Sequence, residues 1–289
     1  MCSSDLFPVA ENPLPAHMAV NAKRVGTRRP ASQIRAPGPP DVAWSYHMCD
    51  HVLAQARANG HEVLRLACGR HKLDHRRIDL FLGTPGLGDI YYGRRDGKEA
   101  HLVLDLRECT FLDPYGITVA CALCHGIAAR VGRIWICLPA DRGVKMYCGV
   151  SGLIEGLGRR VMLVGDGSPG LGPSTDSDVL VPLQEISAEA ELYPVLTLAR
   201  ERLGLLLQRI RWPRAVADRA VKSIMEVAAN VLDHSGERGY LTLQAYGLAS
   251  AKSFLVIAIS DAGVGIRQTL ATRNSQFRSS RIEIGRAHV

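Results

Sequence analysis

Two short segments in the second half of the chain carry side chains suited to metal and phosphate chemistry. Glu226 and Asn230 lie four residues apart in EVAANVLDHS, so a helix would project both from one face. Asp261 directly follows the apolar run SFLVIAIS, and Gly263 and Gly265 come next. A carboxamide oxygen can bind Mg²⁺, a carboxylate can orient or deprotonate an attacking group, and spaced glycines let backbone approach a ligand closely.

Each segment alone is weak evidence for a site. A Glu-x-x-x-Asn pair is most often part of a solvated helix face, and Asp-x-Gly-x-Gly is most often a tight turn between a strand and a helix. The combination is more specific, because a helix, two strands and the glycine turn follow one another along the chain. We therefore treat the two segments as halves of one candidate site.

The elements that would position this site can be predicted from hydrophobic periodicity. Helical spacing predicts amphipathic helices over 188–212 and 213–236, and alternation predicts strands over 240–248 and 253–260. The second helix has one apolar stripe that we expect to face a core. Its members are Val221, Ile224, Met225, Ala228, Val231 and Leu232.

The first half of the chain predicts a separate α/β unit. Strands are expected over 61–68, 101–106, 133–139 and 161–164, and helices over 44–60, 116–132 and 144–158. Residues 69–99 show little pattern, and residues 7–45 are Pro-, Ala- and Arg-rich without periodicity, which indicates disorder or a mistranslated region. The Gly-, Pro- and Ser-rich stretch within 165–184 is the expected linker.

The second half resembles the GHKL (Bergerat-fold) ATPases, and among them the anti-sigma-factor kinases, over about 185–272. EVAANVLDHS matches the family's N box and DAGVGI matches its first glycine box. The resemblance implies that Asn230 binds Mg²⁺ and that Glu226 is the catalytic carboxylate. It also implies that Asp261, Gly263 and Gly265 hold the adenine of ATP, and that Asp233 and His234 belong to the cofactor-binding set.

The first half resembles a STAS domain, the fold of anti-sigma-factor antagonists, clearly from residue 100 to 164 and with expected bounds 46–164. The resemblance rests on the strand, the FLDPYG turn, the helix and the following strand. Phosphorylated members carry Ser or Thr straight after the aspartate of that turn, whereas Asp113 is followed here by Pro114 and Tyr115. We expect a docking or sensing role for this unit and no phosphorylation switch of that type.

Together the resemblances predict an α/β protein: a small STAS-like mixed α/β domain followed by a truncated Bergerat-type α/β sandwich at 185–282. The function they imply is a cytoplasmic bacterial signalling regulator that transfers phosphate from Mg-ATP to Ser or Thr of a partner. The implied partners are a sigma factor or an anti-sigma antagonist, with a homodimer possible, no direct nucleic-acid contact and no membrane. A non-enzymatic binding module and a sensor histidine kinase fragment are the alternatives, although 188–212 contains no phosphoacceptor histidine.

Both ends of the chain predict an artefact of sequencing. Suitable codons for Glu283–Val289 contain AGATCGGAAGAGCACACGTC, and the reverse complement read from its GTG encodes Met1–Leu6. We expect both adapter-like tails to be foreign and the natural protein to continue beyond about Ile282. The family's second glycine box does not follow Gly265. We therefore expect the present chain to bind ATP weakly or not at all, and the natural full-length protein to bind it.

Composition narrows the remaining classes. Residues 7–100 supply about +5 of the formal charge of +7 and have almost no aromatic residues before Trp44, so nucleic-acid binding is a weak interpretation. The eight cysteines follow no secretory signal, which favours a reducing compartment without a disulfide framework. Three further motif matches do not predict a ligand site. They are a haem-type CALCH at 121–125, a glycine-rich GDGSPG at 165–170, and a zinc-like set of Cys49, His51, Cys68, His71 and His75.

Overall fold

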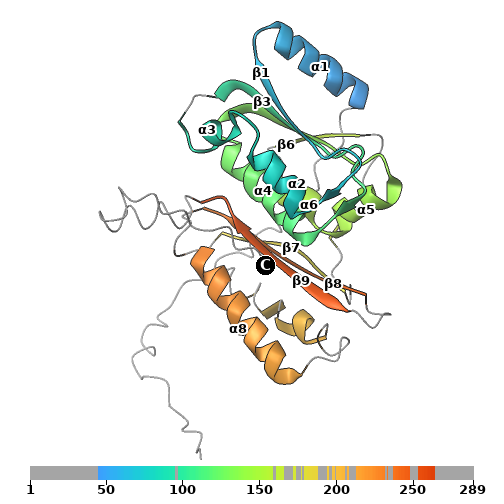
Figure 1. Cartoon of the computed structure of the whole chain (residues 1–289), viewed down its shortest axis with the longest axis vertical. Coiled ribbons are helices and arrows are strands. Elements are labelled where there is room, and N and C mark those ends of the chain that lie inside the picture. Colours follow the sequence, from blue (N-terminus) through green and yellow to red (C-terminus); the bar gives the residue numbers. More distant parts are fainter. Residues whose placement is uncertain are drawn as a thin grey trace, which may run out of the picture. The chain divides into compact units, whose positions relative to one another are not determined.

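The computed structural model describes most of the chain between residues 45 and 263. The described residues are 45–94, 97–158, 161–165, 172–173, 177, 179–187, 194, 197–198, 200–205, 207, 213–231, 233, 237–247 and 253–263. All of them belong to one compact unit that spans 39–289. They form a mixed α/β structure that contains one parallel and one antiparallel sheet (Figure 1).

Four parallel strands form the sheet of the first half. Their spatial order is β1, β3, β5 and β6, and each pairs with its neighbour in parallel. The bounds are β1 Glu62–Ala67, β3 Gly97–Asp105, β5 Val131–Cys137 and β6 Val161–Val164. The apolar runs 102–104, 134–137 and 161–164 are largely buried because helices cover both faces of a parallel sheet. Strand β1 instead alternates between exposed and buried residues over most of its length. The strands predicted in this half are confirmed.

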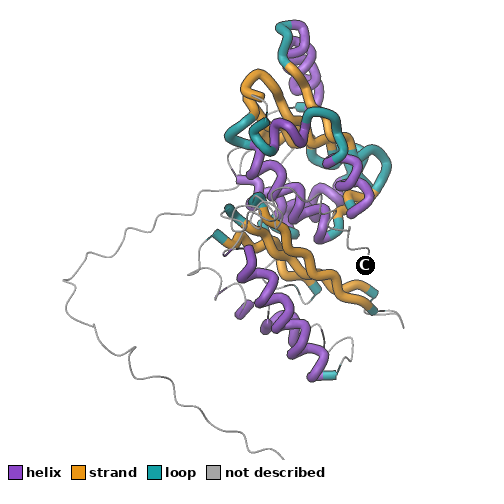
Figure 2. Tube along the Cα trace, turned by 60° about the vertical axis from the view of Figure 1, so that its left-hand side comes forward, coloured by secondary structure: helices purple, strands orange, loops and turns teal. Residues whose placement is uncertain are grey.

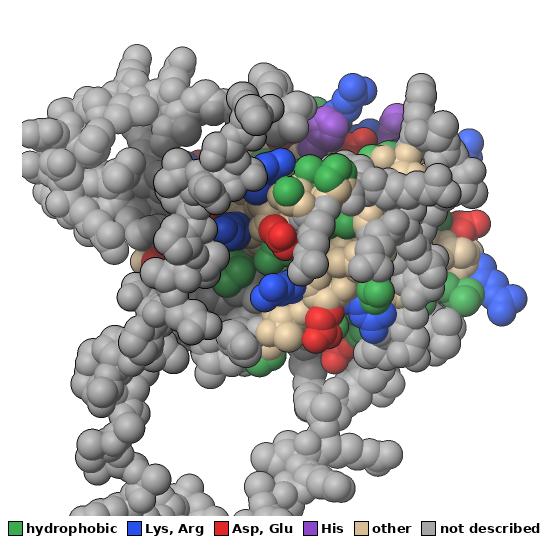
Figure 3. All heavy atoms as spheres, turned by 90° about the horizontal axis from the view of Figure 1, so that it is seen from below, with side chains coloured by type: hydrophobic (Ala, Val, Ile, Leu, Met, Phe, Trp, Pro, Cys, Tyr) green, Lys and Arg blue, Asp and Glu red, His purple; other side chains and the backbone are tan. Residues whose placement is uncertain are grey.

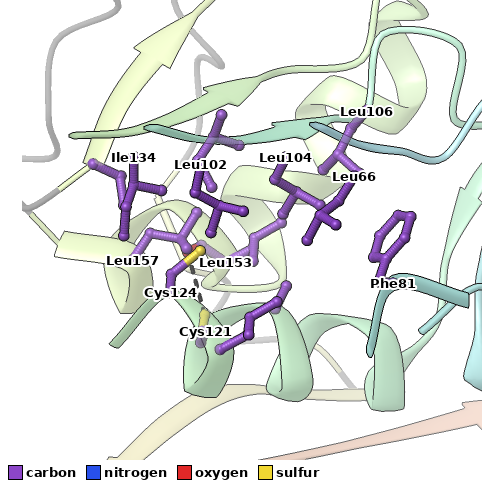
Figure 4. Packing of buried hydrophobic residues seen from close by; sticks show 14 of the residues in the cluster. Leu66, Phe81, Leu102, Leu104, Leu106, Cys121, Cys124, Ile134, Leu153 and Leu157 are labelled. Atoms are coloured by element: carbon purple, nitrogen blue, oxygen red, sulfur yellow. Dashed lines mark hydrogen bonds between the residues drawn. The ribbon is translucent and has the colours of Figure 1, made fainter. Parts of the chain in front are cut away.

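The two faces of the parallel sheet bury different sets of side chains. Helix α1 (Tyr46–Ala58) packs Cys49 and Leu53 against Val103, Trp135 and Val164 on one face. Helices α4 (Pro114–Ile127), α5 (Arg142–Val150) and α6 (Leu153–Leu157) cover the other face, which contributes the leucine-rich core in Figure 4. Its labelled members include Leu66, Leu102, Leu104, Ile134, Leu153 and Leu157.

The span 69–99, in which the sequence shows little pattern, folds into short elements against α4. They are β2 Lys72–Leu73, α2 His75–Leu82 and α3 Leu87–Tyr91, and β2 pairs in parallel with β4 (Phe111–Leu112). Asp74 caps α2 by accepting a hydrogen bond from the Arg77 amide. Only two residues form each strand of this pair, so no periodic signal could have revealed it.

Three antiparallel strands and a long helix form the second half. The strands are β7 Leu180–Ile186, β8 Gly239–Tyr246 and β9 Phe254–Asp261, with β8 in the centre. Helix α8 (Arg214–Asn230) runs along one face of this sheet (Figure 2). Ile224 and Ala228 of α8 join Leu241 and Leu243 of β8 in a small apolar cluster. The predicted strands and the second predicted helix are confirmed, whereas much of 188–212 lies outside the described residues.

The opposite face of the antiparallel sheet lies against α4. Helix α4 contacts both β8 and β9, and Tyr240 of β8 and Leu183 of β7 belong to the same apolar core as the α4 side chains. Ten of the fourteen residues of α4 are buried, which a helix needs when it lies between two sheets. The two halves therefore share one core through this helix.

Three predictions differ from the structure. The helix predicted over 144–158 is two helices, because Gly152 adopts a left-handed backbone with φ of 80° between α5 and α6. Strand β7 begins at Leu180, inside the expected linker, since LVPLQEI pairs with β8 and is mostly buried. Met225 is 45% exposed, although we placed it in the buried stripe, because Ile224 and Ala228 hold the sheet-facing side of α8.

Two histidines at the start of the parallel strands predict a loss of stability on acidification. The rings of His61 and His101 stack with centroids 5.3 Å apart. Burial, then His61 and Arg133, lower the pKa of His101 below its usual value. The folded state therefore resists protonation that the unfolded chain accepts, so this contribution to stability is present above pH ~6.5 and falls as the pH drops below it.

We expect the free energy of unfolding of the His101→Gln variant to fall less between pH 7 and pH 5 than that of the parent chain. Urea titrations at several pH values would measure both. His51→Gln, on the exposed side of α1, controls for removal of a histidine as such. Equal pH slopes for the parent chain and His101→Gln would contradict the prediction.

Candidate functional site

Helix α8 presents the predicted acid and amide on one exposed side. Glu226 and Asn230 are both exposed, while Ile224, Ala228 and Val231 are buried at the sheet. The helix begins after Pro213, whose φ of −59° suits the start of a helix, and its buried stripe fixes its rotation about its own axis. The two side chains predicted from spacing therefore share a face and are free of core packing.

The predicted glycine turn begins at the end of β9. The Asp261 carboxylate is exposed, and its Oδ1 accepts a hydrogen bond from the Gly263 amide at 2.8 Å. Along β9, Leu255, Ile257 and Ile259 pack on the α8 side of the sheet. Because side chains alternate along a strand, Asp261 belongs to the same face as these residues, which is the face that α8 covers.

A close approach at Gly239 connects α8 to the glycine turn. Gly239 is the first residue of β8 and pairs with Asp261 across the sheet. A Cβ at this position would lie 2.4 Å from Cγ1 of Val231, the residue that follows Asn230. The C-terminal end of α8 and the C-terminal end of β9 therefore meet at one end of the sheet. The fold brings Asn230 and Asp261 to this shared end.

The remaining predicted residues are less well placed. Asp233 is exposed just beyond α8, whereas His234 and Gly265 lie outside the described residues. Across the residues that the structure describes, no three His, Cys, Asp or Glu side chains gather as a metal site. Hydrated Mg²⁺ does not need such a cluster, and the exposed carboxamide of Asn230 beside an exposed carboxylate fits an ion that takes its other ligands from phosphate and water.

The FLDPYG turn of the first half is a helix cap in this structure. Asp113 precedes α4 and its Oδ1 accepts a hydrogen bond from the Gly116 amide at 2.7 Å. Pro114 occupies the first helical position, where its missing N–H costs nothing. Burial raises the pKa of the Asp113 carboxyl, and the bond from the Gly116 amide opposes that shift. The capping role is sufficient to explain the aspartate.

The cysteine and glycine motifs that were set aside have structural explanations where they are described. Cys121 and Cys124 lie in the apolar core between α4 and the parallel sheet (Figure 4), and burial raises the pKa of both thiols. Seven cysteines are buried free thiols in the part of the chain that the structure describes. Of the GDGSPG motif only Gly165 is described, so that motif lies largely outside the description.

Two cavities flank the antiparallel sheet. One, of about 490 Å³, lies along β7, and neither Glu226 nor Asn230 is among its described lining residues. The other, of about 670 Å³, is lined by Gly263 and by residues of α3 and α4. Neither the tyrosines nor the arginines of this second cavity were identified from the sequence, because they lie in 91–94 and at the end of α4, where no motif marks them.

The face of the molecule in Figure 3 carries described basic and acidic side chains interspersed with apolar ones. Charges of both signs on this face are typical of a solvated protein surface. None of the helices in the described ranges combines the length and the apolar character that crossing a membrane requires. Comparisons with protein-family models, with curated proteins and with solved structures find no match to this chain.

Proposed function

We propose that the second half of the chain is a nucleotide-binding unit that takes Mg-ATP between α8 and the end of β9. The observation that supports this most is the meeting of Asn230 and Asp261 at one end of the antiparallel sheet, linked through Val231 and Gly239. In this proposal Asn230 holds Mg²⁺ and Asp261 accepts a hydrogen bond from the adenine amino group. The ion supplies charge neutralisation at the phosphates.

We propose further that the protein is a signalling regulator of the anti-sigma-factor-kinase type, in which Glu226 orients or deprotonates a Ser or Thr hydroxyl of a partner. Two features support this proposal: Glu226 is exposed one helical turn before Asn230, and the buried residues of α8, Ile224 and Ala228, lie on its sheet-facing side. Phosphoryl transfer depends mostly on positioning and electrostatics, so one carboxylate at this position is chemically sufficient. The partner would be a sigma factor or an antagonist protein.

The first half would dock or sense partners in this scheme. Its STAS-like character remains a proposal that rests on the order of strand, capped turn, helix and strand around Asp113. Because α4 contacts both sheets, a partner bound to the first half would act on the antiparallel sheet through a continuous packed core.

A second candidate is a non-enzymatic module that binds ATP without turnover. The absence of Glu226, the residue assigned to transfer, from the described linings of both cavities favours it. The non-enzymatic module and the kinase predict the same binding of Mg-ATP, but only the kinase transfers phosphate to a partner.

Titration with Mg-ATP of this chain, and of any longer chain that contains it, tests the binding proposal. We expect Asn230→Ala to weaken ATP binding at least tenfold, about 1.4 kcal/mol, because the metal contact is lost. We expect Glu226→Ala to bind ATP nearly as well and to lower phosphate transfer to the partner by roughly 10²- to 10⁴-fold.

The matched control is Glu201→Ala, which removes an exposed glutamate from helical structure outside α8. If neither Asn230→Ala nor Glu226→Ala changes binding or transfer, the proposed site is wrong. If ATP binds and nothing is transferred in any variant, the non-enzymatic module is the correct reading.

A further inference from the structure

In the lining of the second cavity, the Tyr91 side chain packs against Gly126, and we call this pair the floor of the cavity. Tyr91 at the end of α3 lies so close to Gly126 of α4 that a Cβ there would stand 2.7 Å from its Cε2 atom. Burial first, then the nearby Tyr92 and Asp261, raise the pKa of the Tyr91 phenol to about 12. The edge of the ring that carries the hydroxyl therefore lies against α4, and the hydroxyl stays a hydrogen-bond donor across the neutral range.

Aromatic and cationic groups surround this floor. The Tyr92 ring meets Tyr91 edge to face, with centroids 5.3 Å apart, and is 64% exposed. The Arg94 guanidinium lies 5.5 Å from the centre of the Tyr92 ring and is paired with Asp89 at 3.1 Å. Such an arrangement suits stacking of a further planar group, since arginine and tyrosine both present flat faces.

The lining of the cavity also contains one further cation and one acid. Arg130 donates a hydrogen bond to the Gly126 carbonyl, and its Nε lies 3.7 Å from the position that a Cβ on Gly93 would take. Glu237 lies 3.7 Å from Nε2 of His125. Because Asp89 balances the charge of Arg94, an anionic group of a ligand would bind at Arg130, and Glu237 would accept hydrogen bonds from donors on the same ligand.

The volume limits the size of that anion. The cavity of about 670 Å³ lies within the range of ligand sites, roughly 300–1,000 Å³. A planar ring for Tyr92 and Arg94, a phosphate for Arg130 and an amino group for Glu237 together describe a nucleoside monophosphate. The cavity also reaches Ala262 and Gly263. Ala262 is buried and alternates with Asp261, so this is the sheet face away from α8.

We propose that this cavity, lined by Tyr91, Tyr92, Arg94, Arg130, Glu237 and Gly263, is a second ligand site that binds a nucleoside monophosphate independently of α8. Binding here does not require that the proposed Mg-ATP site be correct. One further consequence does rest on the proposed Mg-ATP site. The ligand would contact the glycine turn from the sheet face away from α8, and would change the affinity of the α8 face for ATP.

Calorimetric titration of the protein with AMP in the absence of Mg²⁺ tests the site. We expect Arg130→Gln and, separately, Tyr92→Ala to weaken AMP binding at least tenfold. Tyr92 is largely exposed, so its removal tests the contact without a threat to folding. Inorganic phosphate and adenosine, titrated alone, should each bind more weakly than AMP, because each supplies only one half of the contacts.

Two controls separate this site from the proposed Mg-ATP site. Asn230→Ala on α8 and Arg133→Gln, an exposed arginine of β5 outside the cavity lining, should leave AMP binding within twofold of the parent protein. No AMP binding, or AMP binding that Asn230→Ala removes while Arg130→Gln preserves it, would overturn the proposal. Loss of Mg-ATP binding in Asn230→Ala with AMP binding intact supports both sites separately.

Discussion

Replacement of Asp105 by alanine is expected to lower the free energy of unfolding by about 3 kcal/mol, the lower end of the range for removing one member of a buried ion pair. Asp105 is 6% exposed at the C-terminal end of β3. It accepts hydrogen bonds from Nε of Arg65 at 3.0 Å and from Nη2 of Arg107 at 2.9 Å. Removal of the carboxylate leaves two guanidinium groups without their shared acceptor.

The cluster also holds α1 on the sheet, which extends the expected effect. Nη1 of Arg107 donates to Asp50 of α1 at 2.9 Å, and the guanidinium lies 5.6 Å from the Tyr46 ring centre. Arg65 and Arg107 are themselves partly exposed. Water can therefore solvate the freed cations, which is why the lower end of the range applies.

Urea denaturation followed by circular dichroism measures the loss. Asp105→Asn keeps the shape and one acceptor oxygen, so it should cost less than Asp105→Ala. Asp89→Ala removes an exposed pair with Arg94 and should cost below about 1 kcal/mol. Equal stabilities of Asp105→Ala and Asp89→Ala would show that the buried cluster contributes no more than a surface pair.

Most of the longer strands could be predicted from sequence because they contain an apolar run, as HLVLDL of β3 shows, or an alternating pattern, as YLTLQAY of β8 shows. The elements that pack against these strands could not be predicted from the sequence. The α4 segment is apolar on nearly all sides, yet a helix buried by one sheet and a helix buried by two differ only in how wide that apolar face is. The shared core through Tyr240 and Leu183 depends on contacts between residues far apart in the chain, and periodicity contains no such information.

In the candidate site too, local spacing could be predicted from the sequence, whereas contacts between residues far apart in the chain could not. Glu226 and Asn230 were found because their spacing of four is a helical spacing, and the structure places both on the exposed side of α8. Their relation to Asp261 passes through Val231 and Gly239. Gly239 carries no signal in the sequence, since a glycine ahead of a strand is usually only the end of a turn.

The second cavity, which Gly263 lines, is the part of the structure that the sequence predicts least. Its floor requires Tyr91 from a span without pattern and Gly126 from the end of a helix. A glycine inside a helix suggests a close approach, but the sequence does not say which partner approaches. Only the packing of α3 on α4 identifies it.

Replacement of Gly116 by alanine is expected to destabilise the protein by about 2 kcal/mol or more, the range for overpacking a filled core. Gly116 lies in the first turn of α4, and a Cβ there would stand 2.0 Å from the Leu73 carbonyl oxygen. The obstacle is backbone, so no side-chain rotation relieves it. Strand β2 would have to move away from α4, although alanine favours the helix by up to about 1 kcal/mol.

Gly204→Ala is the matched control, because Gly204 is also helical and a Cβ there would meet no atom of the described residues within 4 Å. Helix propensity alone then predicts a gain of up to about 1 kcal/mol. Thermal and urea unfolding of the two variants should therefore shift in opposite directions from the parent chain. If Gly116→Ala also stabilises the protein, β2 does not lie against α4 at this distance, and the packing that joins residues 72–73 to the capped turn is wrong.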